Sequence, residues 1–174
     1  IEAYTSKIAQ PLTDALSLYA IELIANNLVS VYNGTGNKKE WENITMASTI
    51  GGMVINTAGV TLAHGMEHPA SGLKNIVHGQ GLAALTPVVI DASYKGDEEK
   101  FGNIAKIFGG KSAADCADKI RELLKAIDLE CKLSDLGIAE EDIPWMAENC
   151  MKVSAAGVAL SLIHISEPTR RVVI

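Results

Sequence analysis

Apolar side chains recur at helical spacing along most of this chain, and no segment alternates between apolar and polar residues with a period of two. The clearest case runs from Leu12 to Val31, and Pro11 stands at the position where proline opens a helix. Aromatic residues make up only 5% of the 174 residues, whereas the strands of a β-sandwich favour aromatic and β-branched side chains. We therefore predict an all-α fold, a helical bundle with at least six helices.

Glycine, proline and asparagine mark where these helices should end. A polar turn is expected at residues 33–36 after the first helix. Residues 70–77 are expected to form a loop, because Pro69 and Gly72 are helix breakers. The remaining helices are predicted over residues 39–62, 79–94, 98–108, 112–127 and 140–153.

One long stretch, from Glu42 to Glu67, carries no formal charge between its ends. It is long enough to cross a bilayer, which takes about 20 residues. It also contains many polar side chains and four glycines, which makes it too polar for lipid. We predict a buried core helix approached closely by its neighbours at Gly51, Gly52 and Gly59, and no membrane partner.

Charge and cysteine content exclude several classes of protein. The net charge is −6 with no basic stripe, so nucleic acid is not an expected partner. The three cysteines, Cys116, Cys131 and Cys150, are widely spaced and form no CxxC pair. They predict neither a disulfide framework nor a cysteine zinc site, but free thiols in a reducing, cytoplasmic compartment.

The large side chains outside these patterns are expected to serve packing. Trp41 and Trp145 are interpreted as packing residues, and Met46, Met53 and Met66 as core fillers. Met66 is also a candidate to line a cleft, because it lies between two histidines.

Three of the four histidines fall between residues 64 and 78. His64 and His68 are four residues apart and share one face of a helix, while His78 follows a glycine-containing loop. Imidazole nitrogen is a common ligand for zinc and divalent iron, so the three could form one wall of a metal site. The spacing leaves a second hypothesis open, a helical scaffold whose histidines are core residues and whose Glu67 is a surface charge. Glycine directly after both His64 and His78 favours a site where substrate and cofactor approach the backbone.

The same region resembles a known family. The strings HGMEHP at residues 64–69 and HGQGLAAL at residues 78–85, with Gly72 between them, resemble the signature of the iron-containing (group III) alcohol dehydrogenases. Residues 1–4, 11–16 and 46–59 are also similar, so the resemblance extends from residue 1 to about residue 159. The HGMEHP string favours this branch over the related glycerol dehydrogenases and dehydroquinate-synthase-like lyases of the same superfold.

The resemblance implies an NAD(P)-linked oxidoreductase. Members have an N-terminal α/β domain for NAD(P) and a C-terminal all-helical domain that holds a divalent metal, usually Fe²⁺ and sometimes Zn²⁺. Of the metal's one Asp and three His ligands, the last two match His64 and His78. His68 matches a catalytic histidine that lies beside the metal and transfers a proton or positions groups. The implied reaction is hydride transfer between a primary or secondary alcohol and nicotinamide, with the metal lowering the pKa of the alcohol.

The chain also departs from the family pattern. The Asp and the first His ligand of the family belong to a D-x-x-x-H motif that would lie just before Ile1, and no GxGxxG or GGGS occurs. We therefore expect residues 1–159 to be a fragment, a helical domain with half a metal site. Alone it should retain metal weakly or not at all, show no dehydrogenase activity, and self-associate through an exposed apolar surface.

The last residues do not continue this pattern. Residues 160–174 show no helical period, and residues 160–170 (LSLIHISEPTR) look like the translated end of a sequencing-library adapter. We expect His164, which lies in this segment, to have no function.

Overall fold

A computed structural model describes residues 1–150 and 152 of the chain. This part contains seven α-helices and four short 3₁₀ helices and no strand, so the all-α prediction is confirmed. The α-helices are α1 (Pro11–Tyr32), α2 (Lys38–Ala58), α3 (Leu62–Lys74), α4 (His78–Ser93), α5 (Glu98–Ile107), α6 (Cys116–Ala126) and α7 (Ile143–Cys150). The 3₁₀ helices are η1 (Tyr94–Gly96), η2 (Ala113–Asp115), η3 (Leu133–Leu136) and η4 (Glu140–Asp142). The tail from residue 160, with His164, lies outside the described residues.

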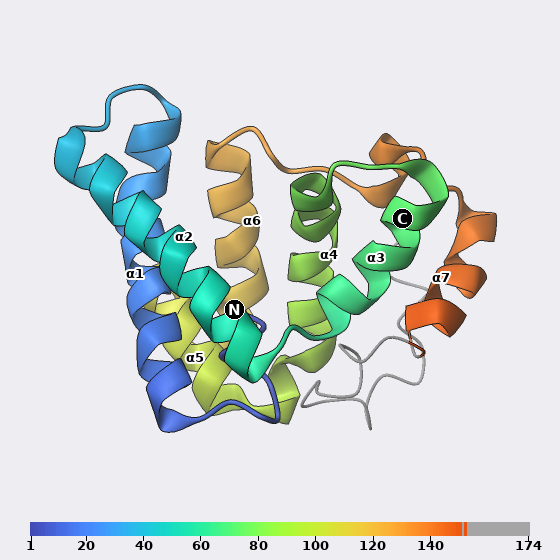
Figure 1. Cartoon of the computed structure of the whole chain (residues 1–174), viewed down its shortest axis with the longest axis horizontal. Coiled ribbons are helices and arrows are strands. Elements are labelled where there is room, and N and C mark those ends of the chain that lie inside the picture. Colours follow the sequence, from blue (N-terminus) through green and yellow to red (C-terminus); the bar gives the residue numbers. More distant parts are fainter. Residues whose placement is uncertain (151, 153–174) are drawn as a thin grey trace.

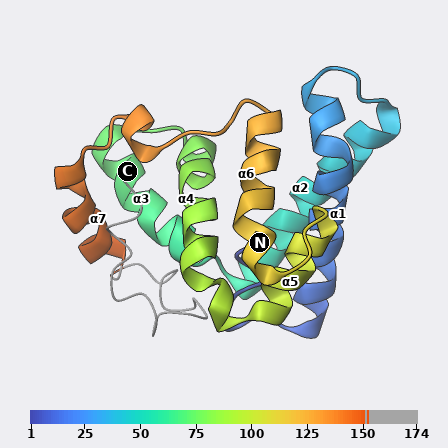
Figure 2. The ribbon, with the colours of Figure 1, turned by 180° about the vertical axis from the view of Figure 1, so that it is seen from behind.

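The helices form two groups joined through α4. The long helices α1 and α2 run side by side at one end of the molecule, and α3 and α7 lie at the other, with α4 and α6 between them (Figure 1). The view from behind shows α5 beneath α6, against the lower half of α1 (Figure 2). The buried residues form three clusters, centred on Met66 and Leu85 under α3, on Ile104 between α5 and α6, and on Val54 between α1 and α2.

Local signals set several helix starts as the sequence predicts. Pro11 opens α1. At the start of α2, the Asn37 side chain accepts a hydrogen bond from the Glu40 amide at 3.1 Å, and the Glu40 carboxylate accepts one from the Asn37 amide at 2.7 Å. Asp115 accepts a hydrogen bond from the Ser112 amide at 2.8 Å, which begins η2 and leads into α6.

The predicted helix over residues 39–62 corresponds to α2, but it was extended too far, because α2 ends at Ala58 and α3 begins at Leu62 with a bend of 100° between them. At Gly59 the backbone has φ +73° and ψ −177°, a conformation that glycine adopts without strain, and α2 ends there. The predicted loop over residues 70–77 is also wrong for most of its length. α3 continues through Pro69 and Gly72 to Lys74. A proline inside a helix removes only one backbone hydrogen bond, and the burial of Pro69 and Ala70 in the core keeps this turn helical.

The prediction that residues 42–67 form a buried core helix is wrong as well. α2 is a surface helix that buries only Ala47, Ile50, Val54 and Ala58. A Cβ atom at Gly51 or Gly52 would meet no described atom within 4 Å, so no neighbour packs closely there.

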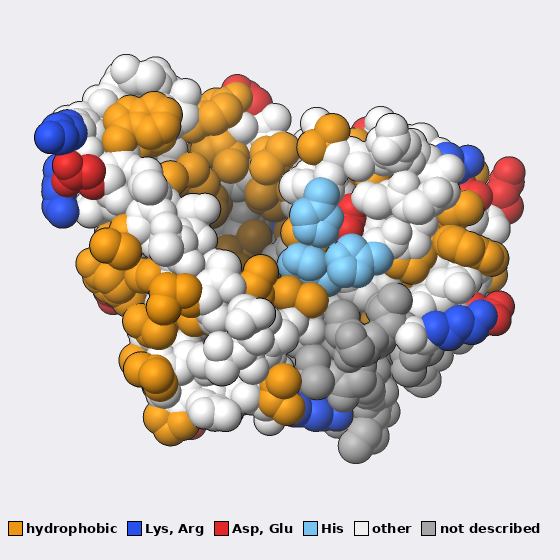
Figure 3. All heavy atoms as spheres, viewed as in Figure 1, with side chains coloured by type: hydrophobic (Ala, Val, Ile, Leu, Met, Phe, Trp, Pro, Cys, Tyr) orange, Lys and Arg blue, Asp and Glu red, His pale blue; other side chains and the backbone are white. Residues whose placement is uncertain are grey.

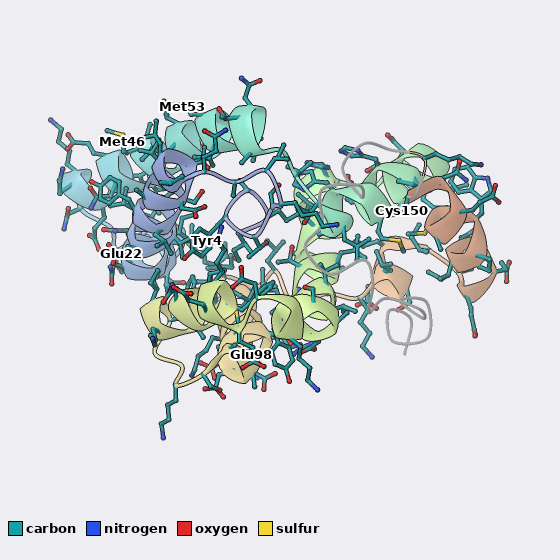
Figure 4. The ribbon with its side chains drawn as sticks, turned by 90° about the horizontal axis from the view of Figure 1, so that it is seen from below. Tyr4, Glu22, Met46, Met53, Glu98 and Cys150 are labelled. Atoms are coloured by element: carbon teal, nitrogen blue, oxygen red, sulfur yellow. The ribbon has the colours of Figure 1, made fainter. Side chains whose placement is uncertain are left out.

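Most of the large side chains expected in the core are exposed. Trp41, Trp145, Met46 and Met53 have 46–56% of their surface accessible, so their interpretation as packing residues is wrong. Met66 is 2% exposed and is a core filler, as predicted. Figure 3 shows hydrophobic side chains over the outer surface of the α1–α2 end, and Figure 4 shows Met46 and Met53 on the outer side of α2.

By length and composition, α1 is long and apolar enough to cross a membrane. The same is true of α2 and α3 taken together, although the two helices are bent by 100° relative to each other. In the structure α1 packs along α2 through Ala20 and also contacts the α5–α6 cluster through Ile21. The three cysteines are free thiols, with Cys116 and Cys150 buried and Cys131 half-buried.

Candidate metal centre

Two helices bring the three imidazoles together. His64 and His68 lie on α3, and His78 is the first residue of α4. The ring centroids are 5.7 Å apart for His64 and His68, 5.2 Å for His64 and His78, and 5.8 Å for His68 and His78. The rings form one group on the face of the molecule seen in Figure 3, beside a hollow. The grouping that the sequence spacing indicated is therefore present.

The turn between α3 and α4 returns the chain to this group. α3 ends at Asn75, which takes the left-handed conformation (φ 50°, ψ 43°) and donates a hydrogen bond from its amide to the Ser71 carbonyl at 2.8 Å. Only Ile76 and Val77 separate this cap from His78. The short connection places His78 next to the α3 histidines.

Glu2, far away in the sequence, lies beneath His64. Its Oε1 accepts hydrogen bonds from the Thr61 amide (2.9 Å), the Thr61 hydroxyl (2.8 Å) and the Ala63 amide (2.9 Å), at the N-terminus of α3. Its Oε2 contacts Nδ1 of His64. Burial raises the pKa of Glu2, but the hydrogen bonds from His64 and Thr61 and the nearby His64 charge together outweigh burial and hold that pKa below its usual value.

Glu67 contacts His78 in the same way as Glu2 contacts His64. Its side chain is fully buried, and Oε2 lies 2.5 Å from Nδ1 of His78. The Ser71 hydroxyl, one turn further along α3, donates a hydrogen bond to Oε1. The scaffold hypothesis, in which Glu67 is a surface charge, does not agree with this burial.

His68 differs from the other two histidines. It is exposed, its ring stacks on His78 with an interplanar angle of 23°, and it makes no hydrogen bond to another described residue. Among the described residues, none fixes the ring nitrogens of His68 by a hydrogen bond.

The donor set fits a divalent metal such as Fe²⁺ or Zn²⁺, for which imidazole nitrogen and carboxylate oxygen are suitable ligands. Nδ1 of His64 contacts the Glu2 carboxylate, and Nδ1 of His78 contacts the Glu67 carboxylate. Nε2 is therefore the nitrogen of each ring that remains available to a metal. Glu67, His68 and His78 also have ligand atoms within 4.8 Å of one another. Both oxygens of Glu67 already contact Ser71 or His78, whereas Nε2 of His64 and of His78 has no partner among the described residues, and this favours His64 and His78 as the ligands.

An apolar pocket of about 260 Å³ adjoins the cluster at His64. Glu2 and side chains from α1, α2 and α4 line it, among them Ile24, Ile55 and Leu82. The site thus combines a group of histidines with an apolar cavity large enough for a few carbon atoms.

Sequence reasoning missed the two carboxylates. The scaffold hypothesis treats Glu67 as a surface charge, and no sequence pattern indicates a role for Glu2. The available signal was position: Glu67 ends an uncharged stretch, and Glu2 stands between apolar residues.

The structure therefore defines a helical domain that presents two carboxylate-held histidines beside an apolar pocket. The model of the Fe-containing alcohol dehydrogenase family, C-terminal, matches residues 1–163. The chain belongs to this family.

Relatives with known activities and structures agree with this assignment. The chain is 39% identical over 160 residues to 1,3-propanediol dehydrogenase of Klebsiella pneumoniae, covering 87% of this chain and 41% of the relative. It is 33% identical over 156 residues to alcohol dehydrogenase 4 of Saccharomyces cerevisiae, with coverages of 87% and 41%. The crystal structure of a 1,3-propanediol oxidoreductase matches with a TM-score of 0.84 and 37% identity, over 91% of this chain and 44% of that one. The chain spans about two fifths of the length of these relatives.

Proposed function

We propose that this chain forms the metal-binding side of an NAD(P)-linked alcohol dehydrogenase. The enzyme would transfer hydride between a primary or secondary alcohol and nicotinamide. What supports the proposal most is that His64 and His78 converge with Nδ1 of each ring held by a carboxylate, so that both Nε2 atoms are available to one ion. The family assignment supports the same activity for the whole protein.

Each histidine has a separate role in this proposal. His64 and His78 are metal ligands, and the divalent ion, Fe²⁺ or Zn²⁺, would supply Lewis acidity that lowers the pKa of an alcohol hydroxyl. His68, exposed beside them, exchanges a proton with the substrate or solvent and is not a ligand. The apolar pocket next to His64 accommodates the carbon chain of the alcohol or aldehyde.

NAD(P) is assigned to parts of the enzyme that this chain does not contain. The sequence holds neither GxGxxG nor GGGS, and we identify no nucleotide-binding residue among the described ones. The free thiols favour a cytoplasmic location, and we propose small molecules as the partners of the site.

A chimeric enzyme tests the proposal. Residues 1–159 would replace the matching C-terminal part of the 1,3-propanediol dehydrogenase of Klebsiella pneumoniae, and the product would be assayed with primary alcohols, diols and NAD(P). We expect metal-dependent turnover that is lost in both His64→Ala and His78→Ala and is reduced, with the metal retained, in His68→Ala. A folded chimera that binds NADH but oxidises none of these alcohols would contradict the proposal.

A further inference from the structure

We propose that Glu67 is a positioning residue that fixes the orientation and tautomer of His78, and that it can do so only because residue 81 is glycine. The proposal rests on the proposed function for the statement that His78 is a metal ligand. The arrangement of Glu67, Ser71, His78 and Gly81 can be tested in the metal-free chain.

The two side chains of the Glu67–His78 pair are very differently buried. The Glu67 side chain is fully buried, whereas that of His78 is 53% exposed. The buried Glu67 carboxylate therefore holds the partly exposed His78 ring, with Nδ1 of His78 2.5 Å from Oε2 of Glu67. An ionised carboxylate only accepts hydrogen bonds, so Nδ1 carries the hydrogen and the lone pair of Nε2 is left for a metal.

Ser71 fixes the carboxylate itself. Its hydroxyl donates a hydrogen bond to Oε1 of Glu67, and the same hydroxyl lies 3.4 Å from the Ile76 carbonyl. Both carboxylate oxygens thus have partners, and the plane of the carboxylate cannot turn without losing one of them. A buried carboxylate is stable only with such partners.

Gly81, on the first turn of α4, makes room for Glu67. A Cβ atom at this position would lie 2.8 Å from Glu67 Cγ, 3.2 Å from Glu67 Oε1 and 2.9 Å from Ile76 Cδ1. Contacts below 3.0 Å essentially do not occur at real Cβ atoms, so a larger residue at position 81 requires Glu67 and Ile76 to shift. Gly79, two residues earlier on the same helix, has no described atom within 4 Å of such a Cβ. It provides a matched control.

The rival interpretation is that Glu67 binds the metal directly, together with His68 and His78. The substitution Glu67→Gln separates the two interpretations. Its amide oxygen can still accept the hydrogen of His78 Nδ1, while its amide nitrogen donates to Ser71 Oγ and the Ser71 hydroxyl turns to the Ile76 carbonyl. Glutamine therefore keeps the positioning contacts but replaces an anionic ligand with a weak neutral one.

The first test is the tautomer of His78 in the metal-free chain, read from ¹⁵N chemical shifts at a pH where imidazole is neutral. We expect the Nδ1–H form in the wild type, in Glu67→Gln and in Gly79→Ala. We expect a mixture of both tautomers in Glu67→Ala and in Gly81→Ala. An unchanged tautomer in Glu67→Ala would overturn the proposal.

The second test is Zn²⁺ affinity measured by competition with a chelator. Loss of such a supporting carboxylate weakens metal binding by about 10–100-fold. We expect this loss in Glu67→Ala and Gly81→Ala, and no further loss when the two are combined, because the clash with Glu67 disappears and the remaining contact is with Cδ1 of Ile76, the flexible end of a side chain. We expect a smaller loss in Glu67→Gln and none in Gly79→Ala. Equal losses in Glu67→Gln and Glu67→Ala would indicate direct ligation, and additive losses in the double variant would overturn the role of Gly81.

These outcomes differ from a failure of the proposed function. If His78→Ala binds Zn²⁺ as well as the wild type does, His78 is not a ligand and the proposed function fails. The tautomer experiment then still decides whether Glu67 and Gly81 position the His78 ring.

Discussion

Glu2 serves two purposes at once, because its carboxylate caps the N-terminus of α3 and holds His64. The spacing of His64 and His68 was sufficient to predict that they share a helix face, whereas the approach of His78 through a glycine-containing loop was a hypothesis. The carboxylates beneath them were not predictable in the same way. Glu2 lies 62 residues from His64, and helical spacing gives the direction of Glu67 but not its burial.

Replacing Glu2 with alanine tests the capping role. The substitution leaves the Thr61 and Ala63 amides without their partner in a buried place. We expect a loss of about 2 kcal/mol in the free energy of unfolding, measured by urea denaturation. Glu22→Ala, at an exposed position on α1, is the control and should change stability by less than about 0.5 kcal/mol. Equal effects of the two substitutions would show that Glu2 does not stabilise α3.

The buried thiols give the stability a pH dependence. Burial raises the pKa of Cys116 to about 12 and that of Cys150 to about 11, from about 9 in an exposed thiol. The folded state therefore keeps the protons that the unfolded state releases, so this contribution is complete below pH 9 and is lost as the pH rises from about 9 to 12. We expect urea denaturation to show lower stability at pH 10 than at pH 8, with a smaller difference in Cys116→Ala. The same difference in the wild type and in Cys116→Ala would contradict this role.

Among the helices, those with clear terminal signals were predictable, whereas the break between α2 and α3 and the continuation of α3 to Lys74 were not. Pro11 marked the start of α1, and the helix ends predicted at residues 108 and 112 lie within a few residues of those in the structure. The break between α2 and α3 was missed because a single glycine inside an apolar pattern does not reveal its backbone conformation. Gly59 at φ +73° ends α2 and lets α3 start where Glu2 can cap it.

Two glycine substitutions in this region should act in opposite directions. Gly59→Ala forces a side chain into a backbone conformation that favours glycine, and we expect a loss of about 1–3 kcal/mol in unfolding free energy. Gly52→Ala lies in the middle of α2 at an exposed position with no described atom near the new Cβ, so it should stabilise the chain by about 0.5–1 kcal/mol. Chemical denaturation of both variants provides the measurement. A neutral Gly59→Ala would show that the α2–α3 break does not depend on glycine.

Among the described residues, α2 leaves an apolar surface open on its outer side, over Met46 and Met53 (Figure 4). Composition predicted enough apolar residues for a core, but it does not specify which face of a helix finds a partner. This is why the tryptophans and two methionines were placed in the core by sequence and lie on the surface in the structure.

This surface should cause self-association of the chain. We expect sedimentation velocity to show dimers or larger species for the wild type and mainly monomer for the double variant Met46→Lys/Met53→Lys, with an unchanged melting temperature. The control Ser48→Lys/Asn56→Lys adds the same charge at exposed polar positions of α2 and should associate more than the methionine variant does. Equal association of the two double variants would assign the effect to charge and not to the apolar surface.

The central claim is that His64 and His78 bind one divalent ion, and equilibrium dialysis against Zn²⁺ tests it most directly. Dialysis suits a weak site, because the chain remains in contact with free metal throughout the measurement. We predict one ion per chain, lost in His64→Ala and in His78→Ala and retained in His68→Ala. Retention in His64→Ala together with loss in His68→Ala would contradict the claim and assign the ion to Glu67, His68 and His78.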